Sequence, residues 1–363
     1  MMTRQNDPGE AIGGQRPRAS RWGLYLPLFL LVLVVAGWSA FWFVARHLVN
    51  QRLDQEIAEA SARGDVWTCA DRILGGYPFR LELRCSDVTL ARLSTAGVTR
   101  LSTGPLLAIG QPHTPHHVIV QAKGPLRAEL ADGARVEARW ELMEASRRTR
   151  GGALERLSIE ARKPVVTIAG PPARNDAPAP TVATLSFAAL EAHVRRNPTR
   201  PDADRARDLF IRGSQLASGE LDALFGDANP SDVDMQATMT MADMLEKGLT
   251  PVAIEAWRAA LGMVEVTRFT FKKGIKQFDA RGQLQLDAEK RLAGRIEPSI
   301  ANIDQFAGLR LRGGAMDLAS ALSGRAQPAD PSGLRPLPAI DIRGGRVFLG
   351  PIRLPLPPLQ PLY

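Results

Sequence analysis

The stretch FTFKKGIKQFDARGQLQLDAEKRLAGRIEPSI, residues 269–300, decides the fold. Between Phe278 and Leu286, apolar or small residues occupy every second position, and polar residues lie between them. A period of two is typical of a β-strand with one face packed and the other in water. Polar turn signals at residues 272–274 and 287–291 bound this strand on both sides. The stretch therefore predicts a meander of long antiparallel strands with small residues on one face.

Outside this meander the sequence also predicts mainly β-strands. Alternation at residues 135–141 and the apolar run Val165–Ala169 predict two more, and Gly and Pro recur at short intervals. Thr250-Pro251 is suited to start a helix that ends before Gly262. Ala315–Leu322 is a second, shorter helix candidate. Loops without a phosphate-binding pattern are expected at residues 171–182, 197–204 and 325–338.

Residues from Trp22 to Val44 form an uninterrupted run without a charged side chain. At 1.5 Å per residue, this run covers the roughly 30 Å hydrocarbon core of a bilayer with room for tilt. Aromatic residues at both of its ends suit the two membrane interfaces. A cleaved signal peptide is the alternative, but its apolar core is only about 7–15 residues long. We therefore expect an uncleaved transmembrane helix at residues 22–44 and a juxtamembrane helix at residues 45–64.

The basic residues beside this segment bear on its orientation. Four arginines precede it within residues 1–21, and three follow it in a similar window, Arg46, Arg52 and Arg63. This excess favours a cytoplasmic N-terminus. Residues 1–21 are rich in Gly, Pro and Arg without periodicity, so we expect a disordered cytoplasmic tail.

These patterns together define the expected fold class, which is mainly β within the α+β class. An N-terminal transmembrane helix precedes a large, curved antiparallel β-sheet domain with one or two short helices packed on it. The alternation shows that the sheet has an apolar face without showing what covers that face. An uncovered apolar face would be a groove for lipid, whereas a face covered by the helix after Pro251 would be an ordinary core.

Two cysteines, Cys69 and Cys85, bracket the turn signal Gly76-Tyr77-Pro78-Phe79. Directly paired positions in an antiparallel hairpin have a constant sum, and this pair is centred on Tyr77. We therefore expect the two sulfurs to face each other across adjacent strands and form a disulfide. Two buried free thiols are the alternative, and a zinc site would need further ligands nearby. A disulfide requires an oxidising compartment and would place the domain outside the cytoplasm.

The Cys69–Cys85 segment, with its Gly-Tyr-Pro-Phe-Arg sequence after an N-terminal anchor, resembles an uncharacterised bacterial envelope family, domain of unknown function 2125. Three further stretches are similar to this family: residues 112–119 followed by Gly124-Pro125, residues 193–198 and residues 345–352. The resemblance implies an envelope protein without an established activity, so it supplies no catalytic residue. The strand meander is also similar to the β-rich periplasmic domains of AsmA-like envelope proteins, in which a curved sheet can hold acyl chains.

The most concentrated group of candidate ligand residues is His113, His116 and His117. In an extended chain, His113 and His117 face one side and His116 the other, so a metal site there needs a turn and another ligand. His193 follows Glu191 by two positions and forms either a base–orienter pair or a plain polar contact. No known catalytic motif occurs, so we expect neither an enzyme nor a cofactor.

The formal net charge of +8 raises the question of an anionic partner. The basic residues are scattered and not interleaved with aromatic residues in a stripe, so no nucleic-acid partner is expected. A basic surface that faces anionic lipid headgroups explains the charge better than nucleic-acid binding does. An arginine-biased composition without a partner explains it as well as the lipid-facing surface does.

These features predict a non-catalytic, single-pass protein of the bacterial inner membrane. Its N-terminus would be cytoplasmic, with a periplasmic β-rich domain at residues 65–354 and a Pro-rich C-terminal tail at residues 355–363. We expect this domain to bind or transfer lipid-like molecules in envelope maintenance. Two alternatives stay open: a periplasmic scaffold that binds a protein partner in an envelope complex, and a metal-dependent envelope hydrolase that uses the His113–His117 region.

Overall fold

The computed structural model describes residues 22–92, 98–171, 182–246, 248–301, 333–354 and 356–362. Its first element is α1, a single helix from Trp22 to Ala62. The segments expected as transmembrane and juxtamembrane helices therefore form one continuous helix, which ends two residues before Gly64, at φ 90°. From Tyr25 onward, α1 is long and apolar enough to cross a membrane. The tail expected at residues 1–21 lies outside the described residues.

Strands make up most of the remaining described chain and form two antiparallel sheets. The smaller sheet contains, in spatial order, β1 (Asp65–Cys69), β4 (Val88–Arg92), β5 (Val98–Thr103), β8 (Leu126–Leu130), β9 (Arg135–Arg139), β12 (Val165–Ala169) and β13 (Val182–Ser186).

The larger sheet begins beside α1 and runs across the whole domain. Its first half contains, in spatial order, β2 (Ile73–Gly75), β3 (Leu81–Cys85), β6 (Leu106–Gln111), β7 (Thr114–Ala122), β10 (Leu142–Arg150), β11 (Ala153–Arg162) and β14 (Ala189–Arg196). The order then follows the sequence through β15 (Arg207–Leu216), β16 (Ser231–Met239), β17 (Val264–Lys273), β18 (Lys276–Leu286), β19 (Leu292–Ala301), β21 (Ile340–Arg343), β22 (Arg346–Leu349) and β23 (Ile352–Arg353), while β20 (Arg335–Pro336) also pairs with β19.

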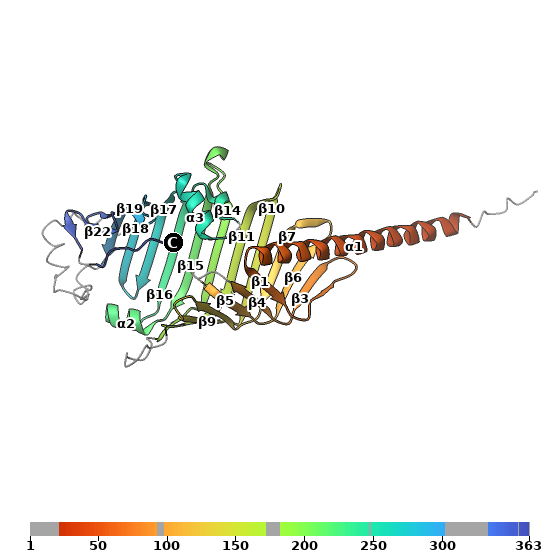
Figure 1. Cartoon of the computed structure of the whole chain (residues 1–363), viewed down its shortest axis with the longest axis horizontal. Helices are drawn as coiled ribbons and strands as arrows, with labels where there is room; N and C mark the ends of the chain where they lie inside the picture. The colour runs from red at the N-terminus through yellow and green to blue at the C-terminus, as the bar shows by residue number, and fades with distance from the viewer. Residues whose placement is uncertain are drawn as a thin grey trace, which may run out of the picture.

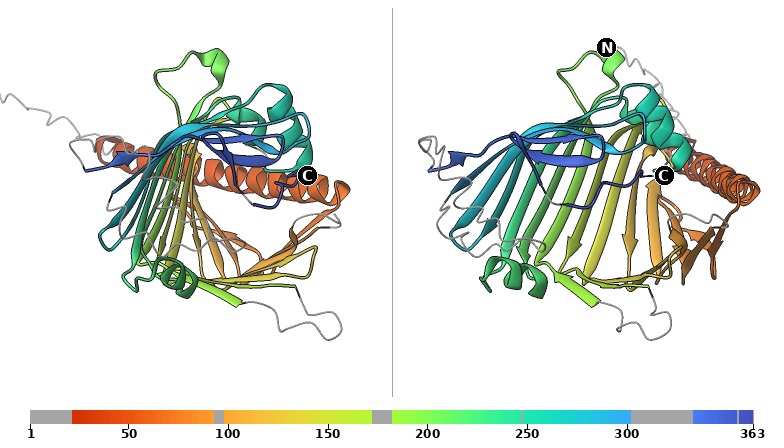
Figure 2. Two further views of the ribbon diagram at one scale, coloured as in Figure 1. Left: turned by 90° about the vertical axis from the view of Figure 1, so that its left-hand side faces the viewer. Right: turned by 60° about the vertical axis from the view of Figure 1, so that its left-hand side comes forward.

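The chain changes sheet after every second strand from β2 to β13. β3 in the larger sheet continues into β4 in the smaller one, β5 in the smaller sheet continues into β6 in the larger one, and this alternation ends with β13 and β14. Each such pair is one long strand with a corner, for example at Gly104-Pro105 and at Gly124-Pro125, where Pro interrupts the ladder. The two sheets are therefore the two walls of a trough (Figures 1 and 2).

The meander predicted at residues 269–300 is confirmed as β17, β18 and β19, which pair in sequence order. The turn predicted at residues 287–291 is also present, because Asp287 donates its backbone N–H to the carbonyl oxygen of Arg291. Small residues in this region have a steric reason. A Cβ atom at Gly294 in β19 would lie 2.1 Å from the carbonyl oxygen of Gln283 in β18.

Two α-helices lie between later strands of the larger sheet, one at the rim of the trough and the other packed against the end of β17. The predicted helix is α3 (Pro251–Ala259), and its N-cap residue Thr250 accepts a hydrogen bond from the backbone N–H of Ala253 at 3.2 Å. α3 packs against the short 3₁₀ helix η2 (Ala242–Leu245) at the rim of the trough. The other helix, α2 (Gly219–Phe225), lies between β15 and β16. The predicted helix Ala315–Leu322 lies outside the described residues.

Candidate functional site

The inner face of the larger sheet is apolar across almost its full width. Residues that are directly paired from strand to strand share one face, and one such row contains no charged or hydrogen-bonding side chain. This row, which we call the inner row, contains Leu83, Ala108, Val120, Ala145, Ile159, Ala192, Ile211, Met235, Phe269, Ala280 and Pro298.

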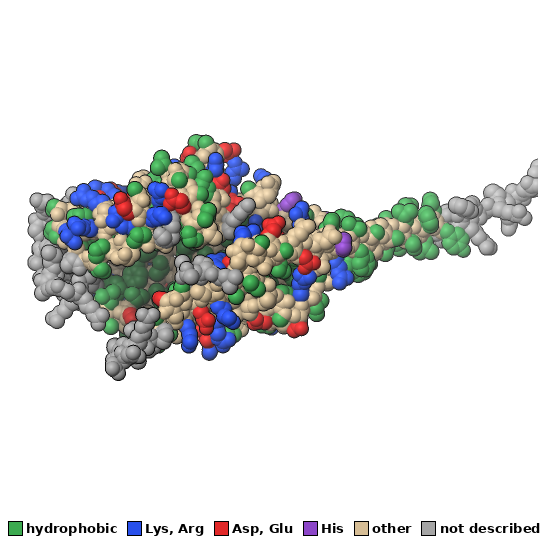
Figure 3. All heavy atoms as spheres, viewed as in Figure 1, with side chains coloured by type: hydrophobic (Ala, Val, Ile, Leu, Met, Phe, Trp, Pro, Cys, Tyr) green, Lys and Arg blue, Asp and Glu red, His purple; other side chains and the backbone are tan. Residues whose placement is uncertain are grey.

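The inner row is only half-buried, although it lies in the middle of the sheet. Every member from Leu83 to Ala280 is partly exposed, and only Pro298 at the far end is buried. A filled protein core would bury residues at such central positions almost completely. Figure 3 shows a hollow lined by hydrophobic side chains between the two walls. Among the described residues, no helix or strand fills the trough.

The smaller sheet presents a matching apolar face. Its corresponding row contains Trp67, Leu90, Leu101, Ala128, Val136, Ile168 and Ala183. The alternate positions of the same strands are mainly polar, as in the row Thr89, Ser102, Arg127 and Glu137. Glu137 accepts hydrogen bonds from Arg127 at 3.1 Å and from Arg139 at 2.6 Å, and these two bonds lower the pKa of its carboxyl group. Both walls therefore have one apolar and one charged face.

One end of the trough is fixed to α1. The indole N–H of Trp38 donates to the carbonyl oxygen of Pro78 at 2.8 Å. The indole N–H of Trp42 donates to the backbone carbonyl oxygen of Arg80, also at 2.8 Å. The position of Trp42 at the end of an apolar run suggested that its ring lies at the membrane interface. Its side chain is instead 2% exposed, so the ring packs against protein. The turn between β2 and β3 instead presents two exposed aromatic side chains, Tyr77 at 51% and Phe79 at 67% exposure.

The predicted disulfide between Cys69 and Cys85 is present, with a Cα–Cα distance of 5.2 Å. The predicted geometry was wrong, because the hairpin is not centred on Tyr77. Leu74 pairs with Leu83 and Cys69 pairs with Val88, so the two cysteines do not lie directly opposite each other. The physical reason is the corner, which moves the chain from the smaller sheet to the larger one between residues 69 and 73. The disulfide therefore links a strand of one wall to a strand of the other.

The three histidines predicted as candidate ligands are separated by the structure. The ring of His113 lies 6.5 Å from that of Trp38, while Nε2 of His117 is 2.9 Å from the hydroxyl oxygen of Ser146. His116 is exposed on the opposite face of β7 from His117. No group of three His, Cys, Asp or Glu side chains in the described ranges is arranged to hold a metal ion.

The pair His193 and Glu191 is brought together on the outer face of β14. Nε2 of His193 lies 3.7 Å from Glu191, and its ring stacks on that of Phe210 with centroids 5.8 Å apart. The contact is polar and lies on a sheet surface formed by neighbouring strands.

Sequence reasoning missed which residues form the inner row. The alternating pattern in each strand marks an apolar face, but the row itself depends on the register between strands such as β7 and β10, which are 20 residues or more apart in sequence. A partial signal for the corners was present, since Pro105, Pro125 and Pro164 mark three of the seven places where the described chain changes sheet, whereas the other four contain neither Gly nor Pro.

The fold and the trough define a class of protein: a folded antiparallel sheet with an apolar interior that is attached to an N-terminal apolar helix. The chain belongs to the family described as uncharacterized protein conserved in bacteria (DUF2125), whose model matches residues 42–357. The match begins at Trp42, one of the residues through which α1 contacts the β2–β3 turn, and it covers the strands of both sheets. No curated protein and no solved structure matches the chain.

Proposed function

We propose that this chain is a non-catalytic, membrane-anchored envelope protein whose trough binds the acyl chains of membrane lipids. The observation that carries the proposal is the half-exposed inner row. Exposed apolar surface of this extent is unfavourable in water and typically marks a binding site. A lipid chain would remove this surface from water, at a gain of about 0.8 kcal/mol for each buried methylene group.

The contact between α1 and the β2–β3 turn supports a lipid occupant. A membrane span needs about 20 apolar residues, and Arg21 limits its start to Trp22, so the span extends at least to Phe41. The turn binds α1 at Trp38 and Trp42, which lie at the end of such a span. The exposed rings of Tyr77 and Phe79 then lie at the membrane interface, where aromatic side chains are favoured. In this arrangement the trough begins at the bilayer surface.

The dimensions of the trough also suit an acyl chain. The inner row crosses eleven strands from β3 to β19. With neighbouring strands about 4.8 Å apart, the row is about 48 Å long, which exceeds the roughly 30 Å thickness of a bilayer's hydrocarbon core. A lipid that leaves the membrane at the β2–β3 end could keep its chains in apolar surroundings along the whole row. This continuity favours transfer as well as binding.

Two further features support a periplasmic location for the trough. The Cys69–Cys85 disulfide suits an oxidising environment, and arginines within residues 1–21 favour a cytoplasmic N-terminus. We therefore propose an inner-membrane protein with its trough in the periplasm. Cysteine labelling in intact cells tests this orientation. A cysteine introduced at an exposed β-strand position should react with a membrane-impermeant maleimide before lysis, and one introduced near Arg4 should react only after lysis.

The direct test of lipid binding is mass spectrometry of lipids that co-purify with the full chain in a mild detergent. Met235→Glu places a charge in the inner row, and Gln236→Glu places the same charge on the outer face one residue later. We expect bound lipid with the unchanged chain and with Gln236→Glu, and several-fold less with Met235→Glu. Equal lipid content in all three would contradict the proposal.

The scaffold alternative is favoured by one observation. β13 is the last strand of the smaller sheet, and apart from one bridge between Ser186 and Ala217 its outer edge pairs with no described strand. An unpaired edge can accept a strand from a partner. Crosslinking in membranes separates the two functions, because a scaffold should give one dominant protein adduct. The hydrolase alternative predicts stoichiometric bound metal by elemental analysis of the purified chain.

A further inference from the structure

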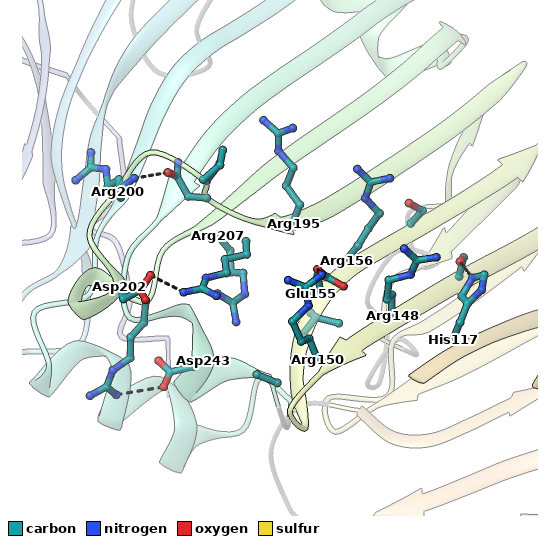
Figure 4. A pocket seen from close by; sticks show the side chains of 18 residues that line it. His117, Arg148, Arg150, Glu155, Arg156, Arg195, Arg200, Asp202, Arg207 and Asp243 are labelled. Carbon is teal, nitrogen blue, oxygen red and sulfur yellow. Dashed lines mark hydrogen bonds and ion pairs between the residues drawn. The ribbon is translucent and has the colours of Figure 1, made fainter. Parts of the chain in front are cut away.

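A second concavity lies on the other side of the larger sheet, at one end of β10, β11 and β14. It has a volume of about 1130 Å³ and lies beneath the loop that joins β14 to β15, next to η2 (Figure 4). Eight of its lining residues are arginines, whereas only three are acidic. We call this feature the arginine pocket. Its volume slightly exceeds the range for small-molecule sites, which is about 300–1,000 Å³.

Three of the arginines are in register on adjacent strands. Arg148 in β10 pairs directly with Arg156 in β11, and Arg156 pairs directly with Arg195 in β14. On the other side of Arg148, the directly paired residue is His117 in β7. Figure 4 shows these four side chains side by side. Like charges directly opposite each other destabilise a sheet, so this row is unfavourable unless negative charge lies beside it.

The protein's own carboxylates neutralise only part of the pocket. Six of the eight arginines have a carboxylate partner: Arg195 pairs with Asp208 and Arg205 with Asp243, both at 3.1 Å, and Arg150, Arg196, Arg200 and Arg207 pair with Glu155, Asp202, Glu265 and Glu246. In the part of the chain that the structure describes, Arg148 and Arg156 have no carboxylate within ion-pair distance. The centre of the cationic row is therefore left without an internal counter-charge.

One of the arginines that line the pocket is buried. Arg207 is 7% exposed, and its Nη2 donates to Glu246 at 2.7 Å. Its buried Nε has no hydrogen-bond partner. An unsatisfied buried donor costs about 1–3 kcal/mol, more when it is charged, and Arg207 lines the pocket.

We propose that the arginine pocket binds a phosphoryl group. Planar guanidinium groups bind phosphate oxygens in pairs, and two adjacent free guanidiniums with a neighbouring imidazole fit such a group. The pocket is larger than a phosphate ion, so the phosphoryl group would be carried on a glycerol- or sugar-sized body. Arg148, Arg156 and Arg195 lie on the outer face of strands whose inner face holds Ala145, Ile159 and Ala192. The proposal therefore stands independently of acyl-chain binding in the trough.

The test is isothermal titration calorimetry on the full chain in detergent, with two probes that share the phosphoryl group. Inorganic pyrophosphate represents a soluble source, and short-chain dihexanoyl phosphatidic acid represents a lipid headgroup. Arg148→Gln with Arg156→Gln removes the two guanidiniums without carboxylate partners. Arg281→Gln is the matched control, because Arg281 lies on the same outer face and pairs with Glu297 at 3.1 Å, away from the pocket.

We expect at least one probe to bind, with affinity that falls as salt rises, and at least tenfold more weakly in the double variant than in the control. Preference between the probes then identifies the source. The double variant should melt at or above the temperature of the unchanged chain at low salt, because it removes like-charge repulsion. If neither probe binds, or if both bind the double variant as tightly as the control, the proposal is wrong.

Discussion

The two faces of the larger sheet are built from the same strands and have opposite properties. The inner face carries an apolar row without charges from Leu83 to Pro298. The outer face carries ion pairs such as Arg212–Asp234 at 2.8 Å and Arg281–Glu297 at 3.1 Å. Solubility explains the outer face, whereas nothing in protein stability requires the inner face to remain half-exposed. Binding of acyl chains, as proposed above, would account for this difference.

Two buried lysines, Lys273 and Lys276, lie where β17 ends and β18 begins, and both are paired with carboxylates. Lys273 is completely buried, and its Nζ donates to Asp222 in α2 and to the carbonyl oxygen of Asn229, both at 2.6 Å. Asp222→Ala should leave this ammonium without its counter-charge and lower the free energy of unfolding by about 3–5 kcal/mol. Chemical denaturation measures the change. Glu297→Ala, which breaks an exposed pair, should cost less than about 1 kcal/mol, and equal costs would show that Lys273 is not buried.

The disulfide joins the two walls, so its removal tests whether they depend on each other. The double variant Cys69→Ser, Cys85→Ser should lose about 3 kcal/mol, as expected for a bridge that closes a loop of this length. Thermal melting of the two forms under oxidising conditions measures the loss. If the two forms melt at the same temperature, the corner between β1 and β2 is held by packing alone.

The open trough can be distinguished from a filled core by two truncations in one strand. Ile211 and Leu216 both belong to β15, but Ile211 lies half-exposed in the inner row and Leu216 is 6% exposed. Leu216→Ala should cost about 2–5 kcal/mol, and Ile211→Ala should cost about 1 kcal/mol or less because little buried surface is lost. Denaturant titration measures both. A similar large cost at Ile211 would mean that the trough is filled.

The smallest effect is expected on the outer face of the smaller sheet, at Glu137. Hydrogen bonds from Arg127 and Arg139 lower the pKa of this carboxyl group in the folded protein. The unfolded chain therefore binds the proton more tightly, and the stabilisation by Glu137 is present above its ordinary pKa and lost as the pH falls through the lowered value. The melting temperatures of the unchanged chain and of Glu137→Gln should differ slightly at pH 7 and converge in acid. A difference that grows in acid would contradict a lowered pKa of Glu137.

Much of the fold could be predicted from the sequence, because the signals are local. The apolar run after Trp22 predicted the helix, alternation at residues 269–300 predicted the meander, and Thr250-Pro251 predicted the start of α3. Lys273 shows where local signals fail, since a lysine beside a turn is expected to be solvated and here it is buried by α2. The burial depends on a helix about 50 residues earlier in the chain.

The candidate sites depend on pairing between distant strands, which the sequence does not specify. The row of Arg148, Arg156 and Arg195 exists only because three strands align in one register. The cysteines illustrate the same limit. Their pairing was predicted correctly, but the corner between β1 and β2 moved the centre of the hairpin away from Tyr77.

The central claim, that acyl chains occupy the trough, is tested most directly by photo-crosslinking in native membranes. A photoreactive phenylalanine would replace Ile211 on the inner face or, as the matched control, Arg212 on the outer face of the same strand. Irradiation followed by mass spectrometry of the full chain measures covalent lipid adducts at each position. We expect lipid adducts at position 211 and none, or several-fold fewer, at position 212. No adduct at position 211, or equal yields at both positions, would contradict the claim.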